Sequence, residues 1–187
     1  RGLGDVYKRQ NGFVSAGNTG ALMAISKFVL KTIKGIDRPA IAALLPTMKG
    51  QAVVLDLGAN VECSNENLVQ FALMGDLFSK SVLGIQNPRL GLLNVGSEQI
   101  KGHTTVKKTF DDLKKMNSKI NFFGFVEGND INKGVVDVIV TDGFSGNIAL
   151  KTAEGVAELI FTFLKNAYAS SLISKLGYLL SLSLIHI

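Results

Sequence analysis

The chain has 187 residues, of which 47% are apolar and 19% are charged, with 20 glycines and only 3 prolines. This composition is typical of one globular domain with a buried core and excludes a disordered chain. The formal net charge of +5 does not indicate a nucleic-acid-binding protein, and a single cysteine excludes a disulfide framework and a cysteine zinc site. With no readable signal peptide, we expect a cytoplasmic location.

The two ends of the chain are related through their coding. Residues 5–10, DVYKRQ, can be encoded by GATGTGTATAAGAGACAG, whose reverse complement translates as LSLIHI, the sequence of residues 182–187. The shared string resembles the transposon end of sequencing adapters. We therefore expect non-native tails at 1–10 and 182–187, and between them, at 11–181, a partial domain truncated at both ends.

Short apolar runs alternate with stretches of helical periodicity along the chain. We predict strands at 12–15, Ala40–Leu45, Ala52–Leu57, Arg89–Asn94, Asn121–Phe125 and Val135–Thr141. We predict helices at Thr19–Lys34, Asn65–Val82, Lys101–Lys115 and Asn147–Leu164 or beyond. Strands that alternate with helices predict an α/β fold with a doubly wound, mainly parallel, Rossmann-like sheet.

Small and polar residues follow four of the predicted strands, in the segments SAGNTG (15–20), DLGANVEC (56–63), NVGSEQIKG (94–102) and TDGFSGN (141–147). Because ligands bind beyond the carboxyl ends of the strands in an open α/β sheet, we expect these loops to form one site. The candidate phosphate- or substrate-binding residues on them are Ser15, Gly17, Asn18, Thr19, Gly20, Asn60, Asn94, Asp142, Gly143, Ser145 and Gly146.

The first of these loops has the composition of an anion-binding turn. Gly17 and Gly20 would let backbone N–H groups approach an anion, and Asn18 and Thr19 would supply side-chain donors. The alternative is an ordinary turn in which Ser15, Asn18 or Thr19 caps the following helix.

The four loops lack the residues for covalent or metal-dependent catalysis, and we expect neither a metal nor a cofactor. Cys63 has no placed histidine partner, and no nucleophile elbow, phosphate-loop lysine motif or dinucleotide fingerprint is present. A reaction whose nucleophile arrives with the substrate fits better, such as attack of phosphate on an acyl thioester. Lys101 and Asn147 are the candidate catalytic donors to an oxyanion. The alternatives are a solvated lysine and a helix N-cap.

Five segments together carry a family resemblance: FVSAGNTGALMA, GIDRPAIAALLPT, VVLDLGANVEC, and the stretches 68–102 and 126–155. They resemble the PlsX family of bacterial phosphate acyltransferases of phospholipid synthesis. The resemblance implies conversion of acyl-[acyl carrier protein] and inorganic phosphate to acyl phosphate. It also implies a homodimer, a fold similar to phosphate acetyltransferases and isocitrate- or isopropylmalate-dehydrogenase-like enzymes, and a role in activity for Lys101 and Asn147.

Two other functions stay open at this point. One is a short-chain phosphate acetyl- or butyryltransferase that uses coenzyme A, and the other is a non-catalytic anion- or nucleotide-binding module. Residues 156–180 add a possible contact: apolar residues recur there at three- and four-residue spacing, with Lys165 and Lys175 beside them. We expect this stretch either to lie at the inner face of the plasma membrane or to pack in a core or dimer interface.

Overall fold

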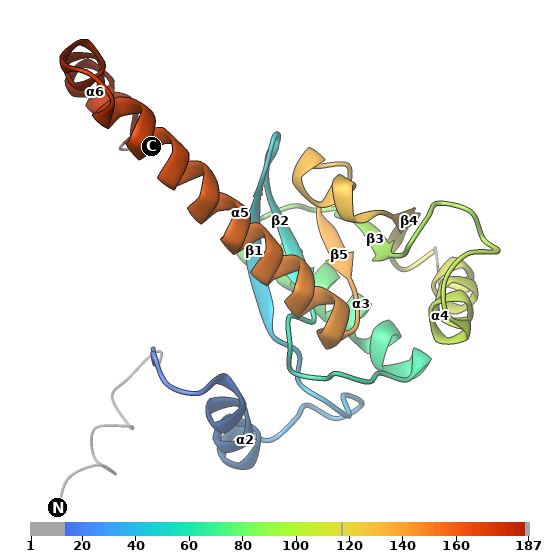
Figure 1. Cartoon of the computed structure of the whole chain (residues 1–187). Helices are drawn as coiled ribbons and strands as arrows, with labels where there is room; N and C mark the ends of the chain where they lie inside the picture. The colour runs from blue at the N-terminus through green and yellow to red at the C-terminus, as the bar shows by residue number, and fades with distance from the viewer. Residues whose placement is uncertain (1–13, 117, 186–187) are drawn as a thin grey trace, which may run out of the picture.

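The computed structural model describes residues 14–116 and 118–185, and a mixed five-stranded sheet forms its centre (Figure 1). In spatial order the strands are β1 (Ala42–Thr47), β2 (Gly50–Leu55), β5 (Val138–Val140), β3 (Arg89–Leu93) and β4 (Asn121–Val126). β1 and β2 form an antiparallel hairpin, whereas β2, β5, β3 and β4 are parallel to one another. The predicted α/β fold with a mainly parallel sheet is confirmed.

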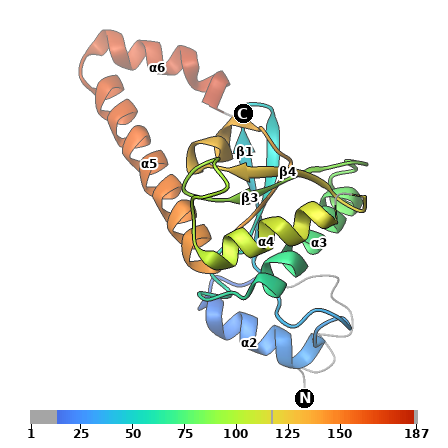
Figure 2. The ribbon, with the colours of Figure 1, turned by 90° about the vertical axis from the view of Figure 1, so that its right-hand side faces the viewer.

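Alternation along the strands divides the core into two layers, because successive side chains point to opposite faces. Val53, Leu90 and Val138 pack on one face with residues of α3 (Asn65–Val82) and α4 (Thr104–Lys115), which lie together in front of the sheet in Figure 2. Val54 and Ile139 pack on the other face, where the start of α5 (Gly143–Ala169) and η1 (Gly128–Lys133) contribute. Helices on both faces explain why the inner strands are apolar throughout.

The structure corrects several predicted element bounds. Val14 and Ser15 are not in a strand, and residues 12 and 13 lie outside the described part of the chain. α2 (Thr19–Leu30) ends before the predicted Lys34, because Lys31 leaves the helix with a φ of 61°. α4 begins at Thr104 and not at Lys101, since Gly102 has a φ of 91°, which a helix does not accommodate.

A further helical correction concerns α5, which begins at Gly143 and not at Asn147. Asp142 is the N-cap residue, and its side chain accepts a hydrogen bond from the Ser145 N–H. This cap offsets the low helix propensity of the Gly-Phe-Ser-Gly segment, so the helix starts four residues earlier than periodicity predicted.

Two helical regions lie largely outside the core. α5 reaches well beyond the sheet, and α6 (Leu172–Ile185) lies at its far end (Figure 1). α2, at the other side of the molecule, has no buried residue. Among the described residues, no helix combines the length and apolarity needed to cross a bilayer. The predicted tail at 1–10 lies outside the described residues, whereas most of the predicted tail at 182–187 is part of α6.

Candidate functional site

Two of the predicted loops are joined by backbone hydrogen bonds where β2 and β5 end. The Asp56 N–H donates to the Thr141 carbonyl over 3.0 Å, and the Thr141 N–H donates to the Leu55 carbonyl over 2.8 Å. Further along both segments, the Gly143 N–H donates to the Asn60 carbonyl over 2.8 Å. The segments 56–63 and 141–147 therefore form one continuous structure at the carboxyl edge, the edge at which the parallel strands end.

Asp56 holds the first of these loops in shape. Its carboxylate is fully buried and accepts hydrogen bonds from the backbone N–H groups of Ile41, Ala59 and Asn60, at 2.9, 3.1 and 2.6 Å. The Asn60 side-chain amide donates to the same carboxylate and to the Pro39 carbonyl, each over 2.8 Å. A buried charge needs such partners. The amide of Asn60, a predicted ligand residue, is thus committed to the loop.

The glycines of the second loop are required by close packing. A Cβ at Gly143 would lie 2.6 Å from the Asn60 carbonyl oxygen, and one at Gly146 would collide with the Asp56 carbonyl oxygen. Asp142 and Ser145 hold the start of α5 in place, because the Asp142 carboxylate accepts hydrogen bonds from both the N–H and the hydroxyl of Ser145, at 2.8 and 2.9 Å. These four predicted residues shape the start of α5 against the Asp56 loop.

Asn147 is the polar side chain of this loop that faces outward. It is exposed on the second turn of α5 and lies beside Gly58, where an added Cβ would be 3.5 Å from the Asn147 Cβ and Cγ. Gly58 has a φ of 120° and carries no side chain that could cover the amide. Because Asp142 is the N-cap, the alternative of Asn147 as a helix cap is wrong. Its amide is available to a ligand at the carboxyl edge.

Lys101 lies on the third loop, which follows β3. The Asn94 side-chain amide fixes this loop by donating to the carbonyls of Gly96 and Lys101, at 3.0 and 3.1 Å. The Lys101 ammonium is about half exposed and pairs with Glu98 at 2.8 Å. A hydrogen bond and charge from Glu98, with a further contribution from Glu127, raise the pKa of Lys101, so the ammonium stays charged at neutral pH. In the described part of the chain, no hydrogen bond joins Lys101 to Asn147.

The fourth predicted loop, 15–20, is exposed along its whole length, and among the described residues no hydrogen bond joins it to the other three loops. Its side chains bond locally: Ser15 accepts from the Gly17 N–H and Asn18 from the Ala21 N–H, at 3.1 and 3.0 Å. Asn18 is therefore the N-cap of α2, as the alternative for this loop supposed. Thr19 and Pro39 line one groove of about 360 Å³, and Pro39 accepts from Asn60, which brings the start of α2 near the Asp56 loop.

Arg38 is a cation at this site that the sequence analysis missed. Together with Asn60, Cys63 and Asn67 it lines an open hollow of about 680 Å³, and its guanidinium donates to the Glu62 carbonyl over 3.3 Å. An arginine directly before a proline and a predicted strand was the available signal. Burial raises the pKa of the Cys63 thiol, which donates to the Asn60 carbonyl, so Cys63 is not poised as a thiolate nucleophile.

Comparison with known proteins shows the family and the fold of this chain. The model of a family described as fatty acid synthesis protein matches residues 5–185. The chain belongs to this family. It is 64% identical to the phosphate acyltransferase of Rhodospirillum centenum over 168 residues, which are 90% of this chain and 47% of the relative. It is 54% identical to that of Methylococcus capsulatus over 173 residues, or 92% of this chain and 50% of the relative.

The chain thus spans about half the length of these two curated relatives. Among solved structures, the EutD phosphotransacetylase from Staphylococcus aureus matches with a TM-score of 0.59 and 17% identity, over 76% of this chain and 49% of that chain. At this identity the match establishes the fold alone, and it confirms the predicted likeness to phosphotransacetylases.

Proposed function

We propose that this chain is part of a phosphate acyltransferase that moves a fatty acyl group from acyl-[acyl carrier protein] to inorganic phosphate. The single observation that carries the proposal is the high identity to several relatives named phosphate acyltransferase, which covers about nine-tenths of this chain. The carboxyl edge supports it, because it presents two donors, Lys101 and Asn147, while burial raises the pKa of the Cys63 thiol and leaves it unactivated.

The reaction suits such a site because phosphate brings its own nucleophilic oxygen. A phosphate oxygen attacks the thioester carbonyl carbon, the C–O bond forms, and the C–S bond then breaks. The proton of hydrogen phosphate leaves with the carrier's sulfur as a thiol. The chain's residues need only orient phosphate and stabilise the negative charge that develops on the carbonyl oxygen. We assign the Lys101 ammonium to phosphate or this oxyanion, and the Asn147 amide to the same charge.

Three parallel assays of a full-length enzyme that carries this segment test the proposal. Acyl phosphate formation is measured with long-chain acyl-[acyl carrier protein], with acetyl-coenzyme A, and without an acyl donor. Formation with the carrier substrate alone is the expected result. Formation only from acetyl-coenzyme A would support the short-chain acyltransferase instead, and phosphate binding without turnover would support the non-catalytic module.

We also propose that residues 156–180 make the contacts that a homodimer or a membrane surface requires. Apolar side chains are exposed along most of this stretch, including Phe161, Phe163, Leu172 and Ile173, the last at 85% exposure. Lys165 and Lys175 line a groove of about 430 Å³ between α5 and α6. Since acyl phosphate is an amphiphile, peripheral contact with the inner face of the plasma membrane would release the product where its acyl chain can enter the bilayer.

A further inference from the structure

The outer face of α4 concentrates the positive charge of the chain. Residues 107–115 of α4 contain four lysines and two aspartates, a net charge of +2, whereas all 187 residues carry +5. Thr109 and Leu113 are fully buried on the inner face of α4. Helical geometry therefore places the lysines on the opposite, solvent side. The outer face, as we use the term, consists of Lys107, Lys108, Asp111, Lys114 and Lys115.

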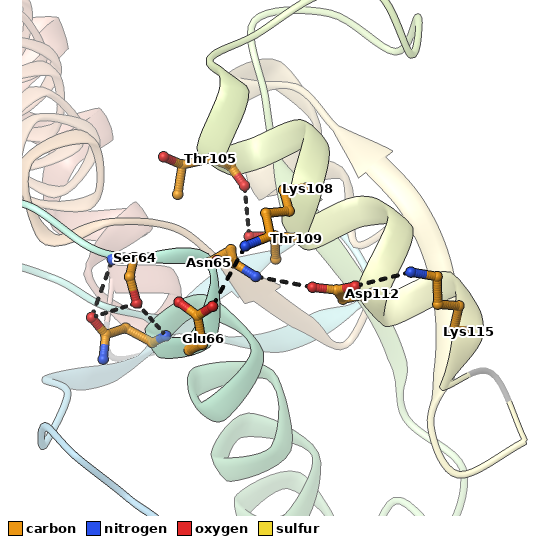
Figure 3. Close-up of polar contacts among 9 residues, drawn as sticks. Ser64, Asn65, Glu66, Thr105, Lys108, Thr109, Asp112 and Lys115 are labelled. Carbon is orange, nitrogen blue, oxygen red and sulfur yellow. Dashed lines mark hydrogen bonds and ion pairs between the residues drawn. The ribbon is translucent and has the colours of Figure 1, made fainter.

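Figure 3 shows two ion pairs that neutralise part of this charge. Lys108 pairs with Glu66 of α3 at 3.6 Å, and Lys115 pairs with Asp112 at 3.2 Å, both in exposed positions. Asp112 also accepts from the Asn65 amide at 2.9 Å, which fixes α4 against the start of α3. Among the described residues, Lys107 and Lys114 form no ion pair, and Lys114 lies 6.0 Å above the Phe110 ring. These two lysines remain available to a partner.

The position of α4 links this charge to the candidate site. α4 begins at Thr104, two residues after the loop that carries Lys101, and it runs back along the sheet away from the carboxyl edge. Its 12 residues span about 18 Å. A macromolecule seated on the outer face would therefore lie beside the entrance to the site, close to Lys101.

Resting on the proposed function, we propose that the outer face of α4 is the docking surface for the acyl carrier, through an acidic face of that carrier protein. Charge complementarity favours a protein of this kind, because spaced lysines around one aspartate match a patterned acidic surface. An anionic bilayer is a poorer match, since the outer face carries no exposed large apolar residue that could enter the headgroup layer.

The test uses the full-length enzyme with Lys107→Glu and Lys114→Glu combined. We expect the KM for the acyl carrier substrate to rise about tenfold, because like charges would then oppose docking. The kcat at saturating carrier and the KM for phosphate should not change. Asp111→Lys should act in the opposite direction and lower the carrier KM, with a steeper dependence on salt. Lys151→Glu, an exposed charge reversal on α5 across the sheet, is the matched control.

Direct binding of carrier protein without an acyl group separates this inference from the proposed function. If the wild type makes no acyl phosphate but binds carrier in a manner sensitive to Lys107 and Lys114, the proposed function fails and the docking surface stands. An unchanged carrier KM in the double variant, or an equal effect of Lys151→Glu, would overturn the docking surface. Loss of binding to anionic vesicles with carrier binding intact would assign the outer face to a membrane and overturn it too.

Discussion

At the scale of single residues, Asp56 is the structural centre of the candidate site. We expect Asp56→Ala to lower the free energy of unfolding by about 3 kcal/mol, because it leaves one buried and two partly buried backbone N–H donors without an acceptor. Denaturant titration of the full-length protein measures this loss. Asp111→Ala, which removes an exposed carboxylate, is the control and should change stability little. Equal stability of the Asp56 variant and wild type would contradict this role.

Lys101 and Asn147 differ from Asp56, because both side chains are exposed and their removal leaves the core intact. We expect Lys101→Ala and Asn147→Ala each to reduce acyl-phosphate formation on the order of a hundredfold, the usual effect of losing one oxyanion donor. The melting temperature should stay near wild type. Lys151→Ala is a suitable control, because Lys151 is an exposed, ion-paired lysine like Lys101. Asn67→Ala would not be suitable, since the Asn67 side chain completes the capping box of α3. Near-normal turnover in both variants would reject the assignment.

At the scale of elements, Arg89 joins the amino ends of β3 and β5 through Asp137. The Arg89 guanidinium donates to both carboxylate oxygens over 3.1 Å, and the Arg89 N–H donates over 2.8 Å. Burial raises the pKa of Asp137, but the hydrogen bonds and charge of Arg89 outweigh it, so the pKa is lower than usual. Asp137 therefore stabilises the fold above its unfolded pKa of about 3.9, and this contribution is lost as pH falls through the lower folded value.

We expect Asp137→Asn to cost about 1 kcal/mol at neutral pH, a figure reduced for the partial exposure of the pair. The difference from wild type should shrink as the pH is lowered below 4, because wild-type Asp137 is then increasingly protonated. Urea titrations between pH 3 and 7 measure it. Asp111→Asn serves as the exposed control, and a constant difference across this range would show that Asp137 does not stabilise as a carboxylate.

At the scale of the whole molecule, the exposed apolar side chains of α5 and α6 are the region expected to bind a membrane surface. We expect the full-length protein to float with anionic vesicles, and Leu172→Glu with Leu176→Glu to abolish flotation, because a charge opposes entry of the apolar face. Leu77→Glu is the matched control, since Leu77 of α3 is 61% exposed and Leu176 is 62% exposed. Wild type in the soluble fraction would refute membrane contact, and loss of a dimer without a lipid effect would assign the region to the interface.

Much of the architecture follows from local pattern. The apolar runs of β2 and β5, each followed by small polar residues, predict both the parallel sheet and the position of the site at its carboxyl edge. Bounds set by single backbone conformations did not follow from pattern. The start of α5 at Gly143 depends on the Asp142 cap, and the absence of a strand at Val14 shows that a short apolar run alone does not specify pairing.

The sequence by itself determined the fold class, the family and three of the four loops expected at the carboxyl edge, because hydrophobic periodicity and motif order are properties of the chain. Only the tertiary structure decided which polar side chains form hydrogen bonds that hold loops and helix ends in place. Asn60, Asn94 and Asp142 look like ligand residues in the sequence, but each is committed to fixing a loop or capping a helix. Asn147 is left outward-facing because Gly58, far away in the chain, has no side chain to cover it. Such commitments depend on contacts between distant segments, which periodicity and local composition do not encode.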